Sequence, residues 1–220
     1  MADYSKPDHW SVKAQKEGYP ARSVYKLKEM DEKFGLFPGG QSGASPFKVL
    51  DLGAAPGSWS LYVLRKFISH SGGTNTVPKN TVPVSLVAVD LAPLSRSFDQ
   101  GLFDKPYFVF IQGDFTESGK REKILSLGPY NLLISDAAPA TSGNRSLDTL
   151  RSLELAETVL DYAASALERG GNLVIKIFQG GNEGSLLKTI RSLFKAGKGF
   201  KPQASRQGSF ETYLIGLGKK

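Results

Sequence analysis

The chain has 220 residues, of which 40% are hydrophobic and 22% charged, a composition typical of a globular protein large enough to bury a substantial core. The absence of cysteine excludes disulfides, thiolate zinc sites and cysteine nucleophiles, and fits a reducing, cytoplasmic compartment. No apolar run is long enough to cross a bilayer, so no membrane association is expected. The two histidines, His9 and His70, stand in polar segments, which disfavours a metal site and histidine-based catalysis.

The net charge of +7 is concentrated towards the C-terminus. From Lys176 onward there are nine lysine and arginine residues against two acidic ones, whereas residues 1–175 carry 19 of each. A basic segment on a neutral body indicates a polyanionic partner, of which nucleic acid is the usual one. The other interpretation is that these lysines serve only solubility.

Residues 1–46 are expected to form two helices and a linker. The first helix is predicted at Trp10–Glu17. Ser23 is placed to cap the second helix, whose apolar residues recur at helical spacing. These residues are Val24, Leu27, Met30 and Phe34. This spacing places Lys26 off the main apolar stripe.

The segment Phe47–Ser60 has the pattern of a strand, a glycine loop and a helix. This arrangement brings backbone N–H groups and a helix N-terminus towards a ligand. We expect Gly53 and Gly57 to leave room for that ligand, because a Cβ at either position would occupy its space. An ordinary strand-to-helix turn fits the same pattern.

Residues 69–83 are rich in turn formers and are predicted to be an exposed, flexible loop insertion. Apolar strands and amphipathic helices then alternate, which predicts a mostly parallel, seven-stranded sheet with helices on both faces. Strands are predicted at Ser85–Leu91, Tyr107–Gly113, Tyr130–Ser135 and Gly171–Phe178, and helices at Glu117–Ser126, Leu147–Glu168 and Gly184–Ala196. Two final strands, Phe200–Ala204 and Phe210–Leu217, predict an antiparallel hairpin at one edge. The whole chain, residues 1–220, is expected to be a single α/β domain.

Three acidic residues, Asp90, Asp114 and Asp136, follow successive predicted strands. Ligands of open α/β sheets bind at this edge. Asp90 is suited to pair with both hydroxyls of a ribose, and Asp114 with an adenine amino group. Any one of them alone is explained equally well as a turn or cap residue, but the three together behind a glycine loop indicate a nucleoside cofactor.

Lys176 stands inside an apolar strand, where lysine is almost never fully buried without a partner. One interpretation is that its side chain reaches water at the end of the sheet. The other is that Asp136, on the neighbouring strand, pairs with it. A second cation nearby would then favour the neutral amine and allow Lys176 to act as a general base.

Seven segments resemble the FtsJ/RrmJ family of S-adenosylmethionine-dependent RNA 2′-O-ribose methyltransferases, in the family's order and over nearly the whole chain. They are EGYPARSVYKLKEMDEKFGLF, LDLGAAPGSWS, VAVDLAP, QGDFT, LISDAAPATSG, VIKIFQGG and KPQASRQGSFETYLIGLG. The resemblance implies a Rossmann-like class I methyltransferase domain and a catalytic tetrad of Lys26, Asp136, Lys176 and Glu211. It also implies cofactor contacts at Gly53, Gly57, Trp59, Asp90, Asp114 and Asp136, and no metal. The sequence departs from the family at Ser58, where many members carry glycine, and in the length of the 69–83 segment.

The resemblance implies methyl transfer from S-adenosylmethionine to a ribose 2′-hydroxyl, with S-adenosylhomocysteine as product and Lys176 as the base. The expected RNA is large-subunit ribosomal RNA, methylated at a uridine by a monomeric enzyme. Cations expected at the mouth of the cleft are Arg22, Lys26, Lys201 and Arg206. A second basic group fits the solvated side of a surface helix equally well, and comprises Lys188, Arg191, Lys195 and Lys198.

Three other functions remain open from the sequence. A transfer-RNA anticodon-loop methyltransferase would share the same tetrad. A non-catalytic RNA chaperone or nucleotide-binding protein would share the fold and the basic face. A nicotinamide oxidoreductase is disfavoured, because the loop reads GAAPG rather than G-x-G-x-x-G and no histidine is placed for hydride transfer.

Overall fold

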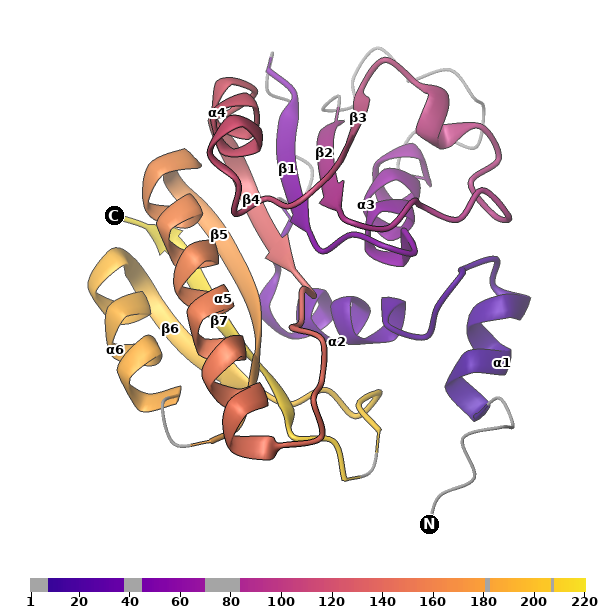
Figure 1. Cartoon of the computed structure of the whole chain (residues 1–220). Helices are drawn as coiled ribbons and strands as arrows, with labels where there is room; N and C mark the ends of the chain where they lie inside the picture. Colours follow the sequence, from indigo (N-terminus) through magenta and orange to yellow (C-terminus); the bar gives the residue numbers. More distant parts are fainter. Residues whose placement is uncertain (1–7, 38–44, 70–83, 181–182, 207) are drawn as a thin grey trace.

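The computed structural model describes residues 8–37, 45–69, 84–180, 183–206 and 208–220. These residues form one seven-stranded sheet of order β3-β2-β1-β4-β5-β7-β6, with helices on both faces (Figure 1). The strands are β1 (Phe47–Leu52), β2 (Val84–Asp90), β3 (Phe108–Gln112), β4 (Tyr130–Ser135), β5 (Leu167–Phe178), β6 (Phe194–Phe200) and β7 (Glu211–Lys219). The helices are α1 (His9–Lys16), α2 (Val24–Phe34), α3 (Ser58–Ser69), α4 (Ser118–Ser126), α5 (Arg145–Ala166) and α6 (Glu183–Leu193), with a short 3₁₀ helix η1 (Leu102–Asp104).

The sheet is parallel from β3 to β5, and β7 is antiparallel to both of its neighbours, β5 and β6. This confirms the predicted mostly parallel sheet with an antiparallel hairpin at one edge. The chain builds outwards from β1 through β2 to β3 and then returns to place β4 on the other side of β1. The carboxyl ends of β1 and β4 therefore border the point where the strand order reverses, which is where open α/β sheets bind ligands.

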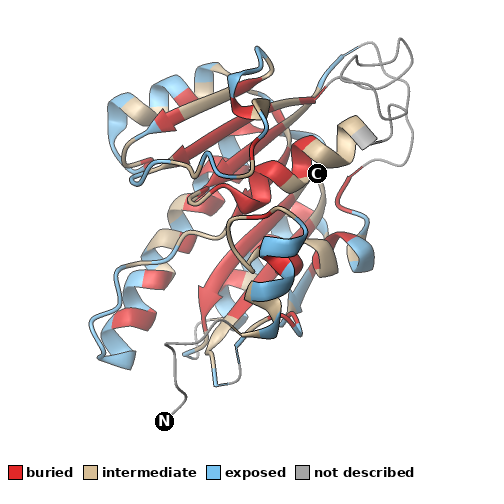
Figure 2. Ribbon diagram, turned by 90° about the vertical axis from the view of Figure 1, so that its right-hand side faces the viewer, coloured by how far each residue is buried: buried red, intermediate tan, exposed pale blue. Residues whose placement is uncertain are grey.

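Two apolar cores cover the two faces of the sheet. Successive residues of a strand point to opposite faces, so Val49 joins one core and Leu50 the other. The first core takes side chains from α1, α2 and α3, and the second from α4, α5 and α6. The central strands are buried on both faces, as Figure 2 shows in red. This burial explains their continuous apolar sequences.

The C-terminal hairpin begins earlier than predicted. Helix α6 ends at Leu193, and the first hairpin strand is Phe194–Phe200 rather than Phe200–Ala204. Phe194 is buried against Gly216, where an added Cβ would lie 2.8 Å from the ring. This contact stabilises residues 194–200 as a strand of the sheet. The strand does not continue through Pro202, because proline lacks the backbone N–H that pairing with β7 would need.

Two other expectations concern loops and membranes. Residues 70–83, most of the predicted flexible insertion, lie outside the described residues, and so does His70. His9 is exposed, in keeping with the polar segment in which it stands. Among the residues that the structure describes, no helix is both long and apolar enough to span a bilayer.

Candidate active site

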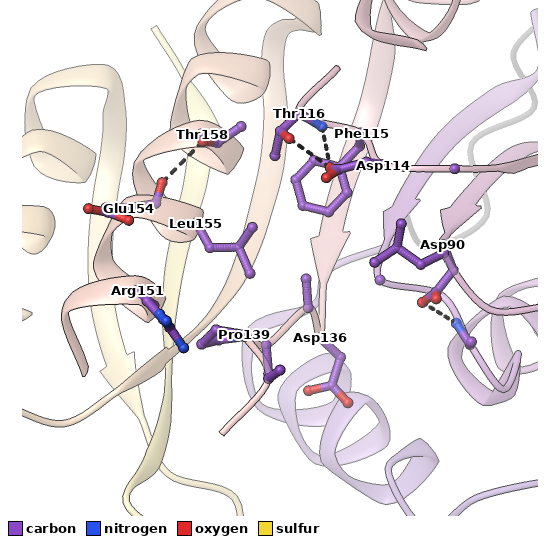
Figure 3. Close-up of a pocket in the computed structure, with 17 residues that line it drawn as sticks. Asp90, Asp114, Phe115, Thr116, Asp136, Pro139, Arg151, Glu154, Leu155 and Thr158 are labelled. Carbon is purple, nitrogen blue, oxygen red and sulfur yellow. Dashed lines mark hydrogen bonds between the residues drawn. The ribbon is translucent and has the colours of Figure 1, made fainter. Parts of the chain in front are cut away.

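A pocket of about 510 Å³ lies at the carboxyl ends of the central strands (Figure 3). The three acids at the strand ends, Asp90, Asp114 and Asp136, all line it, together with Gly53 of the glycine loop. Helix α5 forms another part of the wall through Arg151, Glu154, Leu155 and Thr158. The strand ends therefore bring together acids that are far apart in the sequence.

Asp90 and Asp114 are held by hydrogen bonds from the backbone. The Asp90 carboxylate accepts from the N–H groups of Ala55 and Ala92, each at 2.8 Å. Asp114 Oδ1 accepts from the Thr116 N–H at 2.8 Å and from the Thr116 hydroxyl at 2.7 Å. A carboxylate offers about four lone-pair sites, so each acid retains acceptor capacity for a ligand in the pocket.

At both glycines of the loop an added Cβ would meet a neighbouring segment of the chain, which is a packing reason for glycine that the sequence did not indicate. Gly53 has φ +77°, and a Cβ there would lie 2.6 Å from the backbone N and Cα of Ala137. Gly57 has φ +104°, and a Cβ there would lie 3.0 Å from the Phe103 ring. The loop thus packs directly onto the segment that follows β4, and this contact defines one wall of the pocket.

Gly57 and Trp59 are not among the residues that line the pocket. The Trp59 side chain is buried in the core, and its indole N–H donates to the Ser23 carbonyl at 2.8 Å. Trp59 as a whole is only 2% exposed, so the cofactor contact that the resemblance implied for it is not seen in the lining of this pocket.

Lys176 and Asp136 meet next to this pocket. Strands β4 and β5 are neighbours, and Lys176 Nζ lies 3.2 Å from Asp136 Oδ1. Lys176 is only 8% exposed, so the interpretation that its side chain simply reaches water does not describe the structure. The strand order produces the contact that the sequence predicted between these two residues.

Lys26 and Glu211 form a second ion pair, with Lys26 Nζ 2.8 Å from Glu211 Oε2. Lys26 comes from α2 and Glu211 is the first residue of β7, which pairs with Phe178 of β5. Helical spacing placed Lys26 outside the apolar stripe, yet it is buried, being 8% exposed. The spacing gave no signal for either residue, which only the family resemblance had implied.

Helix α2 is fixed over the site by contacts with α3. The Ser58 hydroxyl accepts from the Ala21 N–H at 2.8 Å and donates to the Ala21 carbonyl at 3.1 Å. Ser23 makes no side-chain cap bond, contrary to the prediction, and its carbonyl instead receives the Trp59 indole. The residue that departs from the family pattern, Ser58, therefore helps to position the helix that carries Lys26.

Tyr213 connects the two ion pairs and was missed in the sequence. Its hydroxyl donates to Asp136 Oδ1 at 2.6 Å, and the Lys26 Nζ lies 5.7 Å from the centre of its ring. Burial and the charge of Asp136 raise the pKa of Tyr213 well above its usual value, so the hydroxyl stays protonated and donates. The alternation of β7 places Tyr213 on the same face as Glu211, which is the only sequence signal for it.

Asp136 is ionised in this setting. Burial by itself would raise the pKa of Asp136. The charges of Lys176 and Lys26, with hydrogen bonds from Tyr213 and Lys176, outweigh burial and hold the pKa below its ordinary value. The centre thus contains two lysines and two carboxylates joined by a tyrosine, a geometry suited to moving one proton beside a bound ligand.

A further buried acid, Asp51, lies at the end of β1 and was also missed. It is fully buried, and burial raises its pKa to about 7 even though the Ser60 hydroxyl donates to it at 2.7 Å. The negative charges of Asp136 and Asp90 act in the same direction as burial. Asp51 therefore titrates near neutral pH in the folded protein.

Comparison with known proteins identifies the relatives of this chain. The model of the FtsJ-like methyltransferase family matches residues 19–219. The chain is 49% identical to ribosomal RNA large subunit methyltransferase E of Treponema denticola, over 99% of this chain and 97% of the relative. It is 43% identical to the protein of the same name from Borreliella afzelii, over 95% of this chain and 96% of the relative.

A crystal structure of a Plasmodium falciparum protein described as a ribosomal RNA methyltransferase has the same fold, with a TM-score of 0.69 and 23% identity. The alignment covers 91% of this chain and 98% of that one. Human methyltransferase-like protein 13, solved in complex with SAH, matches with a TM-score of 0.50 and 14% identity over 78% of this chain and 72% of that one. From the family match over nearly the whole sequence, this chain belongs to the FtsJ-like methyltransferase family.

Proposed function

We propose that this protein methylates a ribose 2′-hydroxyl of RNA, with S-adenosylmethionine as the methyl donor and large-subunit ribosomal RNA as the substrate. The observation that carries this proposal is the Lys176–Asp136 pair at 3.2 Å, buried beside the pocket and linked through Tyr213 to Lys26 and Glu211. The names of the relatives support ribosomal RNA as the substrate.

The pocket fits the methyl donor. Its volume of about 510 Å³ lies within the usual range for small-molecule sites, and its acids suit a nucleoside that carries an ammonium group. Asp90 would accept from the ribose hydroxyls, Asp114 from the adenine amino group and Asp136 from the ammonium. When bound, S-adenosylmethionine would supply a methyl group on a positively charged sulfur, already activated for transfer.

The residues of the chain would then perform one task, removal of the proton from the acceptor hydroxyl. A ribose hydroxyl is a poor nucleophile near neutral pH, so a base must accept its proton as the new O–C bond forms. Lys176 would enter this step as the neutral amine, its Nζ would accept the proton, and Asp136 would stabilise the resulting ammonium. Glu211 holds Lys26 at 2.8 Å, where it would orient the ribose, and positioning would supply much of the remaining acceleration.

The RNA is proposed to approach over a group of cations at the mouth of the site. Arg22 donates to the Ala204 carbonyl, and the charges of Arg206 and Glu211 both act on its guanidinium. Lys201 donates to the Ser209 carbonyl at 2.7 Å and is exposed. These contacts gather Arg22, Lys201 and Arg206 around the start of β7, next to Glu211.

The test incubates the purified protein and labelled S-adenosylmethionine with intact large ribosomal subunits, free ribosomal RNA and transfer RNA. We expect label in large-subunit RNA, on a ribose 2′-oxygen, at one nucleotide after mapping. Label in a transfer-RNA anticodon loop would instead establish the alternative substrate. No label in any RNA, despite donor binding, would favour the non-catalytic alternative. A monomeric state and a cytoplasmic location remain expectations, which sedimentation and cell fractionation would test.

A further inference from the structure

An aromatic pair borders the proposed catalytic centre and has no role in the mechanism above. The rings of Phe178 and Phe210 meet edge to face, with centroids 4.6 Å apart at 64°. Phe178 lies two residues beyond Lys176 and pairs in the sheet with Glu211, which follows Phe210 directly. The Phe210 carbonyl also accepts from the Gln179 N–H at 2.8 Å. The Phe210 ring is therefore held at the edge of the cluster formed by Lys176 and Glu211.

The Phe210 ring is half-buried, and a cation lies over it. The guanidinium of Arg145, the first residue of α5, is 5.5 Å from the ring centre, and Arg145 is exposed. Within the described part of the chain, the Arg145 side chain makes no hydrogen bond or ion pair. Among these residues the contact with Phe210 is thus the only interaction of the Arg145 side chain, so another flat group can replace the guanidinium over the ring.

We infer that Phe210 is a stacking platform for the base of the nucleotide that is methylated, and that Arg145 moves from the ring to a neighbouring phosphate when the base arrives. This inference rests on the proposed function. A base is joined to its ribose by one bond, so a 2′-hydroxyl at Lys176 Nζ requires the base to lie beside the catalytic cluster. The pocket on the Asp90 side is assigned to the methyl donor, which leaves the Phe210 side for the base.

The chemistry of Phe210 and Arg145 matches that of a splayed-out nucleotide. Proteins that recognise unpaired RNA stack bases on aromatic rings and on guanidinium planes. Stacking tolerates any base, because every base has a π-face. Phe210 is therefore a positioning residue for the target nucleotide, and the identity of that nucleotide is decided by other contacts.

The test combines two enzyme forms with two RNAs. Wild type and Phe210→Leu are assayed on the acceptor RNA, once with the intact target nucleotide and once with an abasic ribose at the methylated position, introduced by ligation. With the intact RNA, Phe210→Leu should lower kcat/KM by roughly ten- to a hundred-fold, the range expected for one stacked base. With the abasic RNA, wild type and variant should be nearly equal. Phe210→Tyr should retain most of the wild-type rate.

A matched control is available on α2. Phe34 and Phe200 also meet edge to face, at 5.5 Å and 86°, with the Lys33 ammonium 4.5 Å from the Phe200 ring. Phe34→Leu should leave kcat/KM unchanged on both RNAs. Calorimetric affinity for S-adenosylmethionine should be the same for Phe210→Leu and wild type.

The inference would be overturned if Phe210→Leu lowered kcat/KM equally on both RNAs, or if it lowered kcat/KM on neither. A binding readout without turnover comes from Phe210→Trp, whose fluorescence should be quenched by the intact RNA and much less by the abasic one. If wild type methylates no RNA at all, the proposed function fails, which is distinguishable from failure at Phe210.

Discussion

The Tyr213 hydroxyl donates a 2.6 Å hydrogen bond to Asp136 while the Tyr213 ring lies 5.7 Å from the Lys26 ammonium. One side chain thus joins the Lys176–Asp136 pair, built from the parallel strands, to the Lys26–Glu211 pair, built from an N-terminal helix and the last strand. The proposed catalytic cluster is therefore one connected network rather than two separate ion pairs.

Replacing Tyr213 by phenylalanine should weaken this network without leaving a large cavity. The pKa of Asp136 should rise towards its ordinary value, because a hydrogen bond that favours the carboxylate is lost. The acid limb of the pH profile of kcat should therefore move to higher pH. The value of kcat should fall roughly ten-fold, which is the effect expected from losing one hydrogen bond to a charged group. Tyr130→Phe, which removes a buried hydroxyl that donates to Ile124, is the control and should not move that limb. An unchanged limb in Tyr213→Phe would contradict the proposed link.

Replacing Lys176 by alanine should abolish turnover and leave donor affinity nearly intact. The loss of a general base typically costs roughly a hundred- to ten-thousand-fold in rate. Single-turnover methylation and calorimetric titration with S-adenosylmethionine separate the two effects. Lys188→Ala, which removes an exposed lysine of α6, should behave as wild type. Near-normal methylation by Lys176→Ala would remove Lys176 from the mechanism.

Replacing Asp90 by alanine should act on donor binding instead. The change removes the proposed acceptor for the ribose hydroxyls and also releases the Ala55 and Ala92 N–H groups. Affinity should fall by roughly ten- to a hundred-fold, since bonds to a charged group contribute about 1.5–3 kcal/mol each. Asp161→Ala, at an exposed position of α5 away from the pocket, is the control for calorimetry. Equal affinities in the two variants would exclude Asp90 as a donor contact.

Asp51 should make the stability of the folded protein depend on pH. Burial raises the pKa of Asp51 from 3.8 in the unfolded chain to about 7 in the folded protein. Below about pH 4 the carboxyl is protonated in both the folded and the unfolded state, so it does not lower the free energy of unfolding. Between these values the folded state holds a proton that the unfolded state has released. Stability should therefore fall as pH rises, by ~1.4 kcal/mol per pH unit, and level off above about pH 7.

Denaturant unfolding of wild type and Asp51→Asn at several pH values isolates this contribution. The difference in the free energy of unfolding between the two proteins should change from pH 5 to 7 and stay constant above about pH 7. A difference that is flat across this range would show that Asp51 does not carry the linkage.

Lys201 should contribute to the salt dependence of RNA binding. Each phosphate contact to single-stranded RNA contributes about 0.7 to the slope of log affinity against log salt. Lys201→Ala should lower that slope by about this amount, and Lys195→Ala, at the outer edge of the sheet, should leave it unchanged. Equal slopes for all three proteins would place the RNA elsewhere.

The sequence by itself determined the fold class and part of the site. Apolar strands that alternate with amphipathic helices have few solutions other than a covered parallel sheet, and acids that follow such strands must meet at one edge. Asp90, Asp114 and Asp136 could therefore be grouped before any coordinates. The pairing of Lys176 with Asp136 followed in the same way, because a buried lysine needs a partner on a neighbouring strand.

Apart from the family resemblance, only the tertiary structure decided which residues complete the cluster. Lys26 lies on α2, and Glu211 and Tyr213 lie on β7. Lys26 is 110 residues away from Asp136 in the sequence. Neither hydrophobic periodicity nor local spacing shows how α2 packs against the sheet. Ser58 and Trp59 fix that docking through hydrogen bonds to Ala21 and Ser23. The raised pKa of Asp51 likewise depends on complete burial beneath two packed layers. Local sequence specifies hydrogen-bonding elements and their apolar faces, whereas side-chain contacts between distant elements exist only once those faces have packed together.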